Sequence, residues 1–172
     1  MNGPQNESRL TKLSIHELQQ LPLTHQATIP GEYIDVMGHM NVMWYTHLFG
    51  FGICNTFLLI GLNRDYCETN QAGAFALKQY VNYWLEVRAG EQISIRTRLL
   101  GRSPKRLHLI HFMIKDSNGA LAATSEVLIT HIDMRARRSS LFLSPVSEEI
   151  DRIVQEHATL PWSPPLAGPI YP

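Results

Sequence analysis

The chain has no excess of charge of either sign and very little cysteine. Its 172 residues carry 15 Lys and Arg against 15 Asp and Glu, so the formal net charge is zero. Nonspecific nucleic-acid binding needs a basic excess that neutralises phosphates, so we expect no nucleic-acid partner. The cysteines, Cys54 and Cys67, are too few for a disulfide framework and lack the spacing of zinc or redox sites. An anionic ligand would therefore have to be held by a local basic cluster.

Several familiar sequence signals are also missing. The segment MNGPQNESRLTKL has no apolar core of the kind found in signal peptides, so we expect a cytoplasmic protein. The sequence contains no P-loop, no GxGxxG and no GxSxG motif. His108 and His111 lie three residues apart on an expected strand and would point to opposite faces of a sheet. We therefore expect no metal site.

The most apolar part of the chain runs from Val42 to Leu62 and is about long enough to span a bilayer. It contains His47, Asn55 and Thr56, however, and polar groups at mid-span are unfavourable in lipid. We therefore predict a buried helix that is apolar on nearly all faces and ends at Gly61, and we expect no membrane partner.

The rest of the chain reads as one short helix, five strands and a closing helix. The expected elements are a helix that begins with a Ser14–Glu17 capping box, a strand at 24–29, the long helix, a connecting loop over 61–73, strands at 75–87, 93–99, 106–115 and 121–132, and a helix at 146–157. One antiparallel sheet can bury such a helix only by curling around it. The predicted class is α+β, with a curved antiparallel sheet wrapped around a long central apolar helix.

The domain organisation that we predict is simple. We find no internal repeat and no second domain. Residues 1–22 form an N-terminal extension with a short helix, residues 23–158 form the single domain, and residues 159–172 form a proline-rich tail.

The loop before the long helix carries the side chains most suited to chemistry. Asp35, His39 and Asn41 lie within seven residues of one another. The first N–H groups of a helix have no intrahelical partner and carry the positive end of its dipole, so a carbonyl placed there would be polarised. Gly38 would allow close approach of backbone or ligand. The same residue types also serve helix capping and turns, so both interpretations of this loop stay open.

A family resemblance favours the catalytic interpretation. The string Asp35-x-x-Gly38-His39-x-Asn41-x-x-x-Tyr45 resembles the active-site signature of hotdog-fold acyl-CoA thioesterases, the 4-hydroxybenzoyl-CoA thioesterase-like family. The likeness continues in the segments 83–91, 99–111 and 121–133, and covers roughly residues 27–146. It implies a hotdog fold, an acyl-CoA substrate, no cofactor beyond the coenzyme A of that substrate, and a homodimer or homotetramer with shared active sites.

The resemblance also implies residue roles. Asp35 would be the nucleophile or general base, while His39 and Asn41 would position the acyl group, the water or Asp35 itself. A helix-start amide near Val42 would polarise the thioester carbonyl, and Tyr45 would line the acyl pocket. Related enzymes often carry an acidic residue on the central helix, but here no carboxylate occurs between Tyr45 and Asn63. Asp35 is therefore the one candidate for the catalytic carboxylate in this part of the sequence.

Recognition of the two halves of the substrate is less constrained by the sequence. Arg102, Lys105 and Arg106 cluster at one hairpin and are either CoA-phosphate ligands or an ordinary solvated basic turn. The LGxxxKRLHxxH pattern of the same hairpin is similar to thioesterase modules of carnitine catabolism, whose substrate is betainyl-CoA. A quaternary ammonium group would favour an aromatic cage, and Trp44 and Phe75 are candidate walls together with Tyr45. The same residues also suit a benzoyl or medium-chain acyl group.

Two other functions are compatible with the same fold, because a fold does not determine a function. A hotdog hydratase or dehydratase normally needs a different arrangement of histidine and acid from the one around Asp35. A noncatalytic acyl-CoA or lipid sensor usually carries an effector domain, and the residues before the first strand are too few for a DNA-binding helix-turn-helix. The sequence therefore favours a thioesterase.

Overall fold

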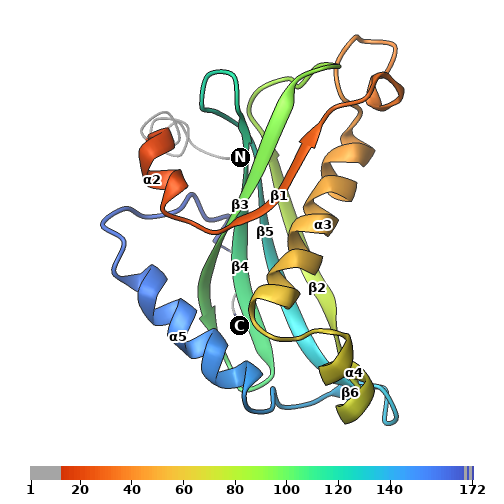
Figure 1. Ribbon diagram of the computed structural model, residues 1–172, viewed down its shortest axis with the longest axis vertical. Coiled ribbons are helices and arrows are strands. Elements are labelled where there is room, and N and C mark those ends of the chain that lie inside the picture. Colours follow the sequence, from red (N-terminus) through yellow and green to blue (C-terminus); the bar gives the residue numbers. More distant parts are fainter. Residues whose placement is uncertain (1–12, 169, 171) are drawn as a thin grey trace.

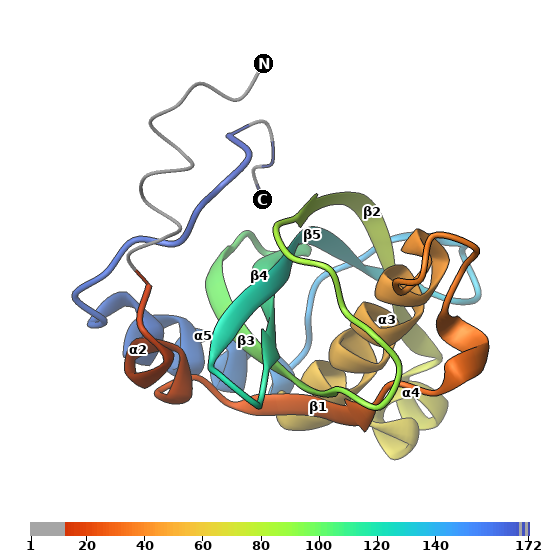
Figure 2. The ribbon, with the colours of Figure 1, turned by 90° about the horizontal axis from the view of Figure 1, so that it is seen from above.

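The computed structural model of the protein describes residues 13–168, 170 and 172. One antiparallel sheet curves around the long helix α3 (Val42–Leu59), as the sequence predicts (Figures 1 and 2). The strand order is β1-β3-β4-β5-β2, and a short strand β6 pairs with β5. The strands are β1 (Leu23–Thr28), β2 (Ala72–Tyr83), β3 (Gln92–Arg102), β4 (Arg106–Lys115), β5 (Ala120–Asp133) and β6 (Arg138–Ser139).

The second strand differs from its prediction at both ends. Strand β2 starts at Ala72, three residues earlier than expected, and ends at Tyr83 instead of Val87. It ends there because the amides of Trp84 and Leu85 both donate to the carbonyl of Ala122, at 2.8 and 3.1 Å, so the regular ladder stops. The segment 84–91 is consequently a loop, and it reaches the start of α3.

The prediction that α3 is buried on nearly all faces is wrong. Its core face consists of Tyr45, Leu48, Phe49, Gly52 and Thr56. The sheet curls around this face only, and on the other side Val42, Met43, Phe51 and Leu58 are 57%, 59%, 43% and 61% exposed. By length and composition α3 is the one described helix that could cross a membrane, a test that core helices of soluble proteins also pass.

The expected long connection after α3 is a second helix. Gly61 follows the last turn of α3 with φ +81° and closes the helix as predicted. Residues that we expected to be loop then form α4 (Arg64–Asn70). The side chain of Asn63 accepts a hydrogen bond from the Tyr66 amide at 3.0 Å and so caps the start of α4.

A polar row crosses the concave side of the sheet beneath α3. We call the side chains of Thr24, Thr56, Thr97 and His111, all of them 4% exposed or less, the buried polar row. Thr97 Oγ1 lies 2.7 Å from both Thr24 Oγ1 and His111 Nδ1, and 3.5 Å from Thr56 Oγ1. The row separates two apolar clusters, one around Phe49 and one around Leu109.

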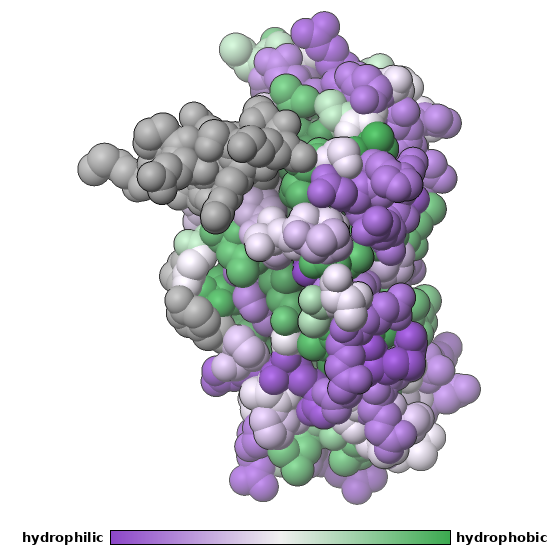
Figure 3. Space-filling model, turned by 90° about the vertical axis from the view of Figure 1, so that its left-hand side faces the viewer, coloured by the Kyte–Doolittle hydropathy of each residue, from purple (hydrophilic) through white to green (hydrophobic). Residues whose placement is uncertain are grey.

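Two further helices cover the remaining parts of the sheet. Helix α2 (Ile15–Gln19) begins with the predicted Ser14–Glu17 capping box. Helix α5 (Val146–Ala158) lies along the part of β3 that β1 does not pair with. Its His157 Nδ1 accepts from the Leu99 amide on this edge of β3 at 2.9 Å, which satisfies the edge amide. In Figure 3, hydrophilic residues run along the right-hand side of that face of the molecule, in both its upper and its lower half.

Candidate active site

Residues 34–41, which we call the site loop, form a tight turn before α3. Ile34 and Met40 pair as an isolated antiparallel bridge, and the Asp35 amide donates to the carbonyl of His39 at 3.0 Å. Gly38 donates back to the Asp35 carbonyl at 3.0 Å and has φ +84°, a conformation that favours glycine. The Asp35 carboxylate accepts from the Met37 amide at 2.9 Å, which fixes the carboxylate within the turn.

The site loop leads directly into the first turn of α3. Asn41 caps the helix, since its side chain accepts from the Met43 amide at 3.0 Å and its carbonyl accepts from the Trp44 amide at 3.0 Å. Among the described residues, no acceptor pairs with the Val42 amide. This N–H therefore remains available, at the positive end of the helix dipole, for an oxygen of a ligand.

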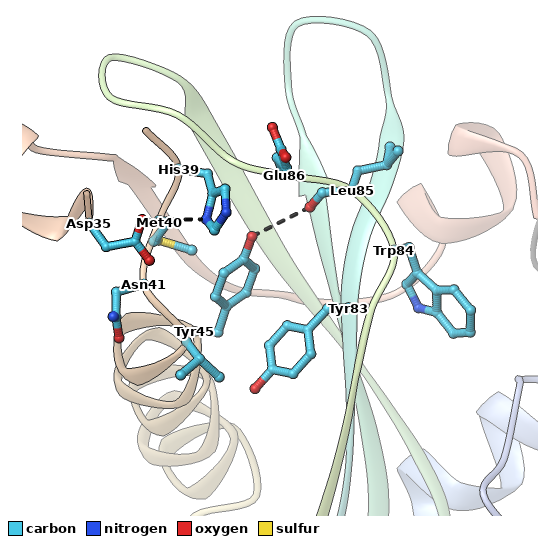
Figure 4. Close-up of a pocket in the computed structure, with 10 residues that line it drawn as sticks. Asp35, His39, Met40, Asn41, Tyr45, Tyr83, Trp84, Leu85 and Glu86 are labelled. Carbon is cyan, nitrogen blue, oxygen red and sulfur yellow. Dashed lines mark hydrogen bonds and ion pairs between the residues drawn. The ribbon is translucent and has the colours of Figure 1, made fainter. Parts of the chain in front are cut away.

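A cavity of about 360 Å³ opens at this helix start, which is within the usual range of small-molecule sites. Two segments that are distant in the sequence form its walls, the site loop with the first turn of α3 and the end of β2 with the loop after it (Figure 4). The lining residues are Asp35, His39, Met40, Asn41, Val42, Tyr45, Tyr83, Trp84, Leu85 and Glu86.

The acid and the imidazole of the site loop are close but not hydrogen-bonded. His39 Nδ1 lies 3.8 Å from Asp35 Oδ1, and the two side chains are 33% and 23% exposed. Because both groups remain partly solvated and line the cavity, each can reach a ligand or a water molecule there.

Two tyrosine rings form the aromatic wall of the cavity. Tyr45 from α3 and Tyr83 from β2 meet edge to face, with ring centroids 5.1 Å apart. The Tyr45 hydroxyl donates to the Leu85 carbonyl at 3.4 Å, which joins the helix to the loop 84–91. Burial raises the pKa of Tyr45, so at neutral pH its hydroxyl stays protonated.

The structure brings most but not all of the predicted site residues together. Asp35, His39, Asn41, Val42 and Tyr45 line the cavity. Gly38 shapes the site loop but does not line the cavity. Trp44 points elsewhere and stacks on Tyr33, with ring centroids 3.8 Å apart.

Phe75 lies far from the cavity of its own chain. It lies near the start of β2, and the eight residue steps of strand from Phe75 to Tyr83 extend about 26 Å. Its ring is 45% exposed and lies 6.0 Å from the guanidinium carbon of Arg137. Phe75 therefore does not form a wall of this cavity together with Tyr45.

The predicted CoA-binding residues lie at the opposite end of the sheet from the cavity. Arg102 ends β3, about 33 Å of strand beyond Gln92, which is adjacent to the loop 84–91. Its guanidinium forms an ion pair with Asp151 of α5, with Nε 2.6 Å from Oδ1. Lys105 and Arg106 are exposed at the same turn. These side chains cannot reach a ligand in the cavity of their own chain.

The cavity wall formed by residues 83–86 was not among the predicted site residues. The strand expected at 75–87 placed Tyr83 and Trp84 within the sheet, whereas β2 ends at Tyr83. Glu86 carries the second carboxylate of the cavity. The signal that could have found it is the Arg88–Gly90 segment, in which Gly90 has φ +80° and turns the chain back toward the sheet.

The remaining histidines are placed differently. His108 and His111 point to opposite faces of β4 as predicted, since His108 Nε2 pairs with Glu126 at 2.7 Å whereas His111 belongs to the buried polar row. Within the described parts of the chain, no three His, Cys, Asp or Glu side chains are grouped as metal ligands.

A curved antiparallel sheet wrapped around a long central helix is the architecture of the hotdog fold. Residues 29–155 match the family model of the thioesterase-like superfamily, and the chain belongs to that family. The match begins just after β1 and covers strands β2 to β6, α3, α4 and most of α5, so family and architecture agree.

Similar proteins carry thioesterase names. A betainyl-CoA thioesterase of Pseudomonas aeruginosa is 27% identical over 144 residues, which cover 84% of this chain and 91% of the relative. An L-carnitine dehydrogenase/betainyl-CoA thioesterase of Agrobacterium fabrum is 31% identical over 80% of this chain, which spans only 28% of that relative. A Staphylococcus aureus protein solved in complex with CoA superposes with a TM-score of 0.79 at 27% identity, covering 88% of this chain and 96% of the other.

Proposed function

We propose that the protein hydrolyses the CoA thioester of a small acyl group, with Asp35 as the catalytic carboxylate. The observation that carries this proposal is that Asp35 and the unpaired Val42 amide line one cavity. A thioester carbonyl oxygen bound to the Val42 N–H would be polarised by the helix dipole. The carbonyl carbon would then face the carboxylate.

Either of two routes follows from this arrangement. As a general base, Asp35 takes a proton from water while the water oxygen adds to the carbonyl carbon. The resulting oxyanion is stabilised by Val42, and its collapse expels the CoA thiolate, which takes up the proton. As a nucleophile, Asp35 displaces the thiolate and forms a mixed anhydride that water hydrolyses. Neither route requires a cofactor beyond the coenzyme A of the substrate.

His39 and Asn41 have supporting roles in this proposal. His39, 3.8 Å from Asp35, orients the carboxylate or the attacking water. Asn41 fixes the direction of the first turn of α3 and hence of the Val42 amide. Asn41 is thus both a helix cap and a positioning residue.

The relatives suggest betainyl-CoA as the substrate to test first. The betainyl group ends in a quaternary ammonium ion, which aromatic faces attract. The aromatic wall of Tyr45 and Tyr83 could contact this ammonium group. In this proposal Tyr83 has the role that we expected for Trp44 and Phe75.

We further propose that the working unit is a homodimer or a homotetramer. Within the described residues β2 pairs with β5 alone, and this open edge carries Phe75, Leu77 and Tyr83 at 45–48% exposure. A partner docked there would also bring Lys105 and Arg106 of one chain toward the cavity of another, where they would hold the CoA phosphates. Sedimentation analysis should give at least twice the 19.6 kDa mass of the chain. The expectations of a cytoplasmic location and of no nucleic-acid or membrane partner stay predictions.

The test of the activity is thiol release from a panel of short, branched, aromatic and betainyl CoA thioesters, with wild type and Asp35→Asn compared. We expect turnover of at least one short thioester by the wild type and none by the variant. Turnover that survives in Asp35→Asn would refute the catalytic assignment. Tight binding of acyl-CoA without any turnover would instead identify a sensor.

A further inference from the structure

Glu86 brings a second carboxylate to the cavity, from the wall that faces the site loop. It follows β2 in the loop 84–91 and lines the cavity together with Asp35. The backbone of Glu86 is fixed, since its carbonyl accepts from Lys115 Nζ at 3.0 Å. In Figure 4 Glu86 lies on the same side of the Tyr45 ring as His39. The Glu86 side chain is 59% exposed and so lies at the rim, whereas Tyr45 is 5% exposed and lies deeper.

The charge of this cavity is not balanced by its lining. Its residues include the acids Asp35 and Glu86 but no Lys or Arg. Lys115, which donates to the Glu86 carbonyl, forms its ion pair with Glu91 at 2.7 Å. The cation paired with the Glu86 carboxylate is Arg88, with Nη2 3.4 Å from Oε2. Those two side chains are 59% and 69% exposed, and an ion pair so exposed to water contributes little. The negative charge of Glu86 is therefore available to a ligand.

Aromatic faces and uncompensated carboxylates together favour one class of ligand. Tyr45 and Tyr83 offer ring surface that excludes water from an alkylated group without donating a hydrogen bond to it. A neutral acyl group would gain contact with the rings but nothing from the charges. An anionic acyl group would be repelled by both carboxylates. A cationic acyl group gains from both features.

We infer that Glu86 is a specificity-determining residue that selects a cationic acyl group over a neutral group of the same shape. The inference rests on the proposed function and deepens it. Asp35 carries out the chemistry at the carbonyl, and Glu86 contacts the charged end of the acyl group at the rim. Attraction between Glu86 and the cation strengthens both ground-state and transition-state binding, so it appears chiefly in KM.

The experiment compares two thioesters that differ only in charge. Betainyl-CoA ends in a trimethylammonium group, and 3,3-dimethylbutyryl-CoA replaces that nitrogen with carbon. The ratio of their kcat/KM values is measured for wild type, Glu86→Gln, Arg88→Gln and Glu32→Gln. The ratio does not depend on how much of each preparation is folded. Glu32 is an exposed acid outside the cavity lining, so its variant removes the same charge from the general field.

The three variants are expected to differ in their effect on the ratio of kcat/KM for betainyl-CoA to that for 3,3-dimethylbutyryl-CoA. Glu86→Gln lowers the ratio about three- to tenfold, as expected for one partly solvated charge near a cation. Arg88→Gln raises the ratio, because it removes the competing cation. Glu32→Gln leaves the ratio within about twofold of wild type, since it lies outside the site. In about 1 M salt, where the Debye length is about 3 Å, the difference between wild type and Glu86→Gln shrinks.

Failure of this inference can be distinguished from failure of the proposed function. An unchanged ratio in Glu86→Gln, or an equal fall in Glu32→Gln, would overturn the role of Glu86 while thiol release continues. A wild type that hydrolyses only the neutral thioester would also overturn it. No thiol release from any thioester of either kind would refute the proposed hydrolysis itself.

Discussion

The site loop holds a carboxylate and an imidazole at the mouth of a cavity, whereas the buried polar row holds an imidazole beneath the central helix. His39 is 33% exposed and its neighbour Asp35 23%. His111 is 0% exposed, and its Nδ1 lies 2.7 Å from the Thr97 hydroxyl. Burial lowers the pKa of His111 to about 3, so it stays neutral in the folded protein across the physiological range.

This difference indicates how the two regions divide their tasks. A partly solvated acid beside a cavity can exchange protons with water and with a ligand. A fully buried imidazole cannot take up a proton without leaving its charge uncompensated. We therefore expect changes in the site loop to affect mainly turnover and changes in the buried polar row to affect mainly the free energy of unfolding.

The largest expected effect is the loss of turnover on substitution of Asp35, and two substitutions there distinguish its chemical role from its role in the turn. Asp35→Asn keeps an oxygen that can accept from the Met37 amide, whereas Asp35→Ala removes it. Both should lower kcat/KM on the order of 10³-fold or more. Only the alanine variant should also lose stability, by about 1 kcal/mol, because a turn hydrogen bond is lost. Thiol release and chemical denaturation measure the two effects. Equal melting of the two variants would contradict the role of the turn.

The next effect is a pH dependence that belongs to His111. Its folded-state pKa lies below its unfolded value of about 6.5, so only the unfolded chain takes up a proton between these values. The contribution of His111 to stability is complete above pH 6.5 and is lost as the pH falls toward 3. Between about pH 6.5 and 5, the free energy of unfolding should fall by roughly 1.5 kcal/mol from this group.

The matched variant for this prediction is His111→Asn, whose amide can still bond to Thr97 but does not titrate. Denaturation at several pH values should give a smaller slope for the variant than for the wild type, although its cavity lowers the starting stability. Subtracting the two curves removes the contribution of the other histidines. Parallel curves would contradict the assignment.

Two glycines of α3 provide a smaller and opposite pair of effects. A Cβ at Gly52 would lie 3.2 Å from Ile95 Cγ2 and 3.3 Å from His111 Nδ1, whereas a Cβ at Gly50 would meet nothing within 4 Å. Gly52→Ala should therefore destabilise by roughly 1–2 kcal/mol through overpacking. Gly50→Ala should stabilise by about 0.5–1 kcal/mol through helix propensity. Thermal melts of the two variants measure both effects. A stabilising Gly52→Ala would show that Ile95 and His111 move aside at little energetic cost.

The smallest effect concerns Asn41, which is both the cap of α3 and a positioning residue of the proposed active site. Asn41→Ala removes the cap on the Met43 amide and should cost about 1 kcal/mol of stability, whereas Asn41→Ser keeps a capping oxygen. If the cap is the main role, Asn41→Ser should melt like the wild type and keep most of its kcat/KM. A serine variant that melts normally but loses turnover would assign Asn41 a direct contact with the substrate.

The parts of the fold and site that could be predicted depend on short-range sequence. Asp35, His39 and Asn41 lie within one turn and one cap, so their proximity follows from local geometry. The curled sheet follows from the alternating strands and one long apolar helix. Helix α4 was missed although Asn63 carries a capping signal, because the segment has few apolar residues to mark its period.

The parts that could not be predicted depend on long-range pairing. Glu86 and Tyr83 reach the cavity because β2 pairs with β5 and ends at Tyr83, and no local pattern specifies that register. Phe75 and Arg102 carry suitable chemistry but lie at the far ends of β2 and β3. Strand length therefore separates residues that composition alone would group together.

One assay tests most directly whether the chemistry resides in the site loop. Wild type, Asp35→Asn and His111→Asn are compared for kcat/KM per folded molecule on the best thioester of the panel, at a pH and temperature where all three are folded. We predict a loss on the order of 10³-fold or more for Asp35→Asn and a change of less than about tenfold for His111→Asn. Retained turnover in Asp35→Asn, with loss in His111→Asn, would contradict the account.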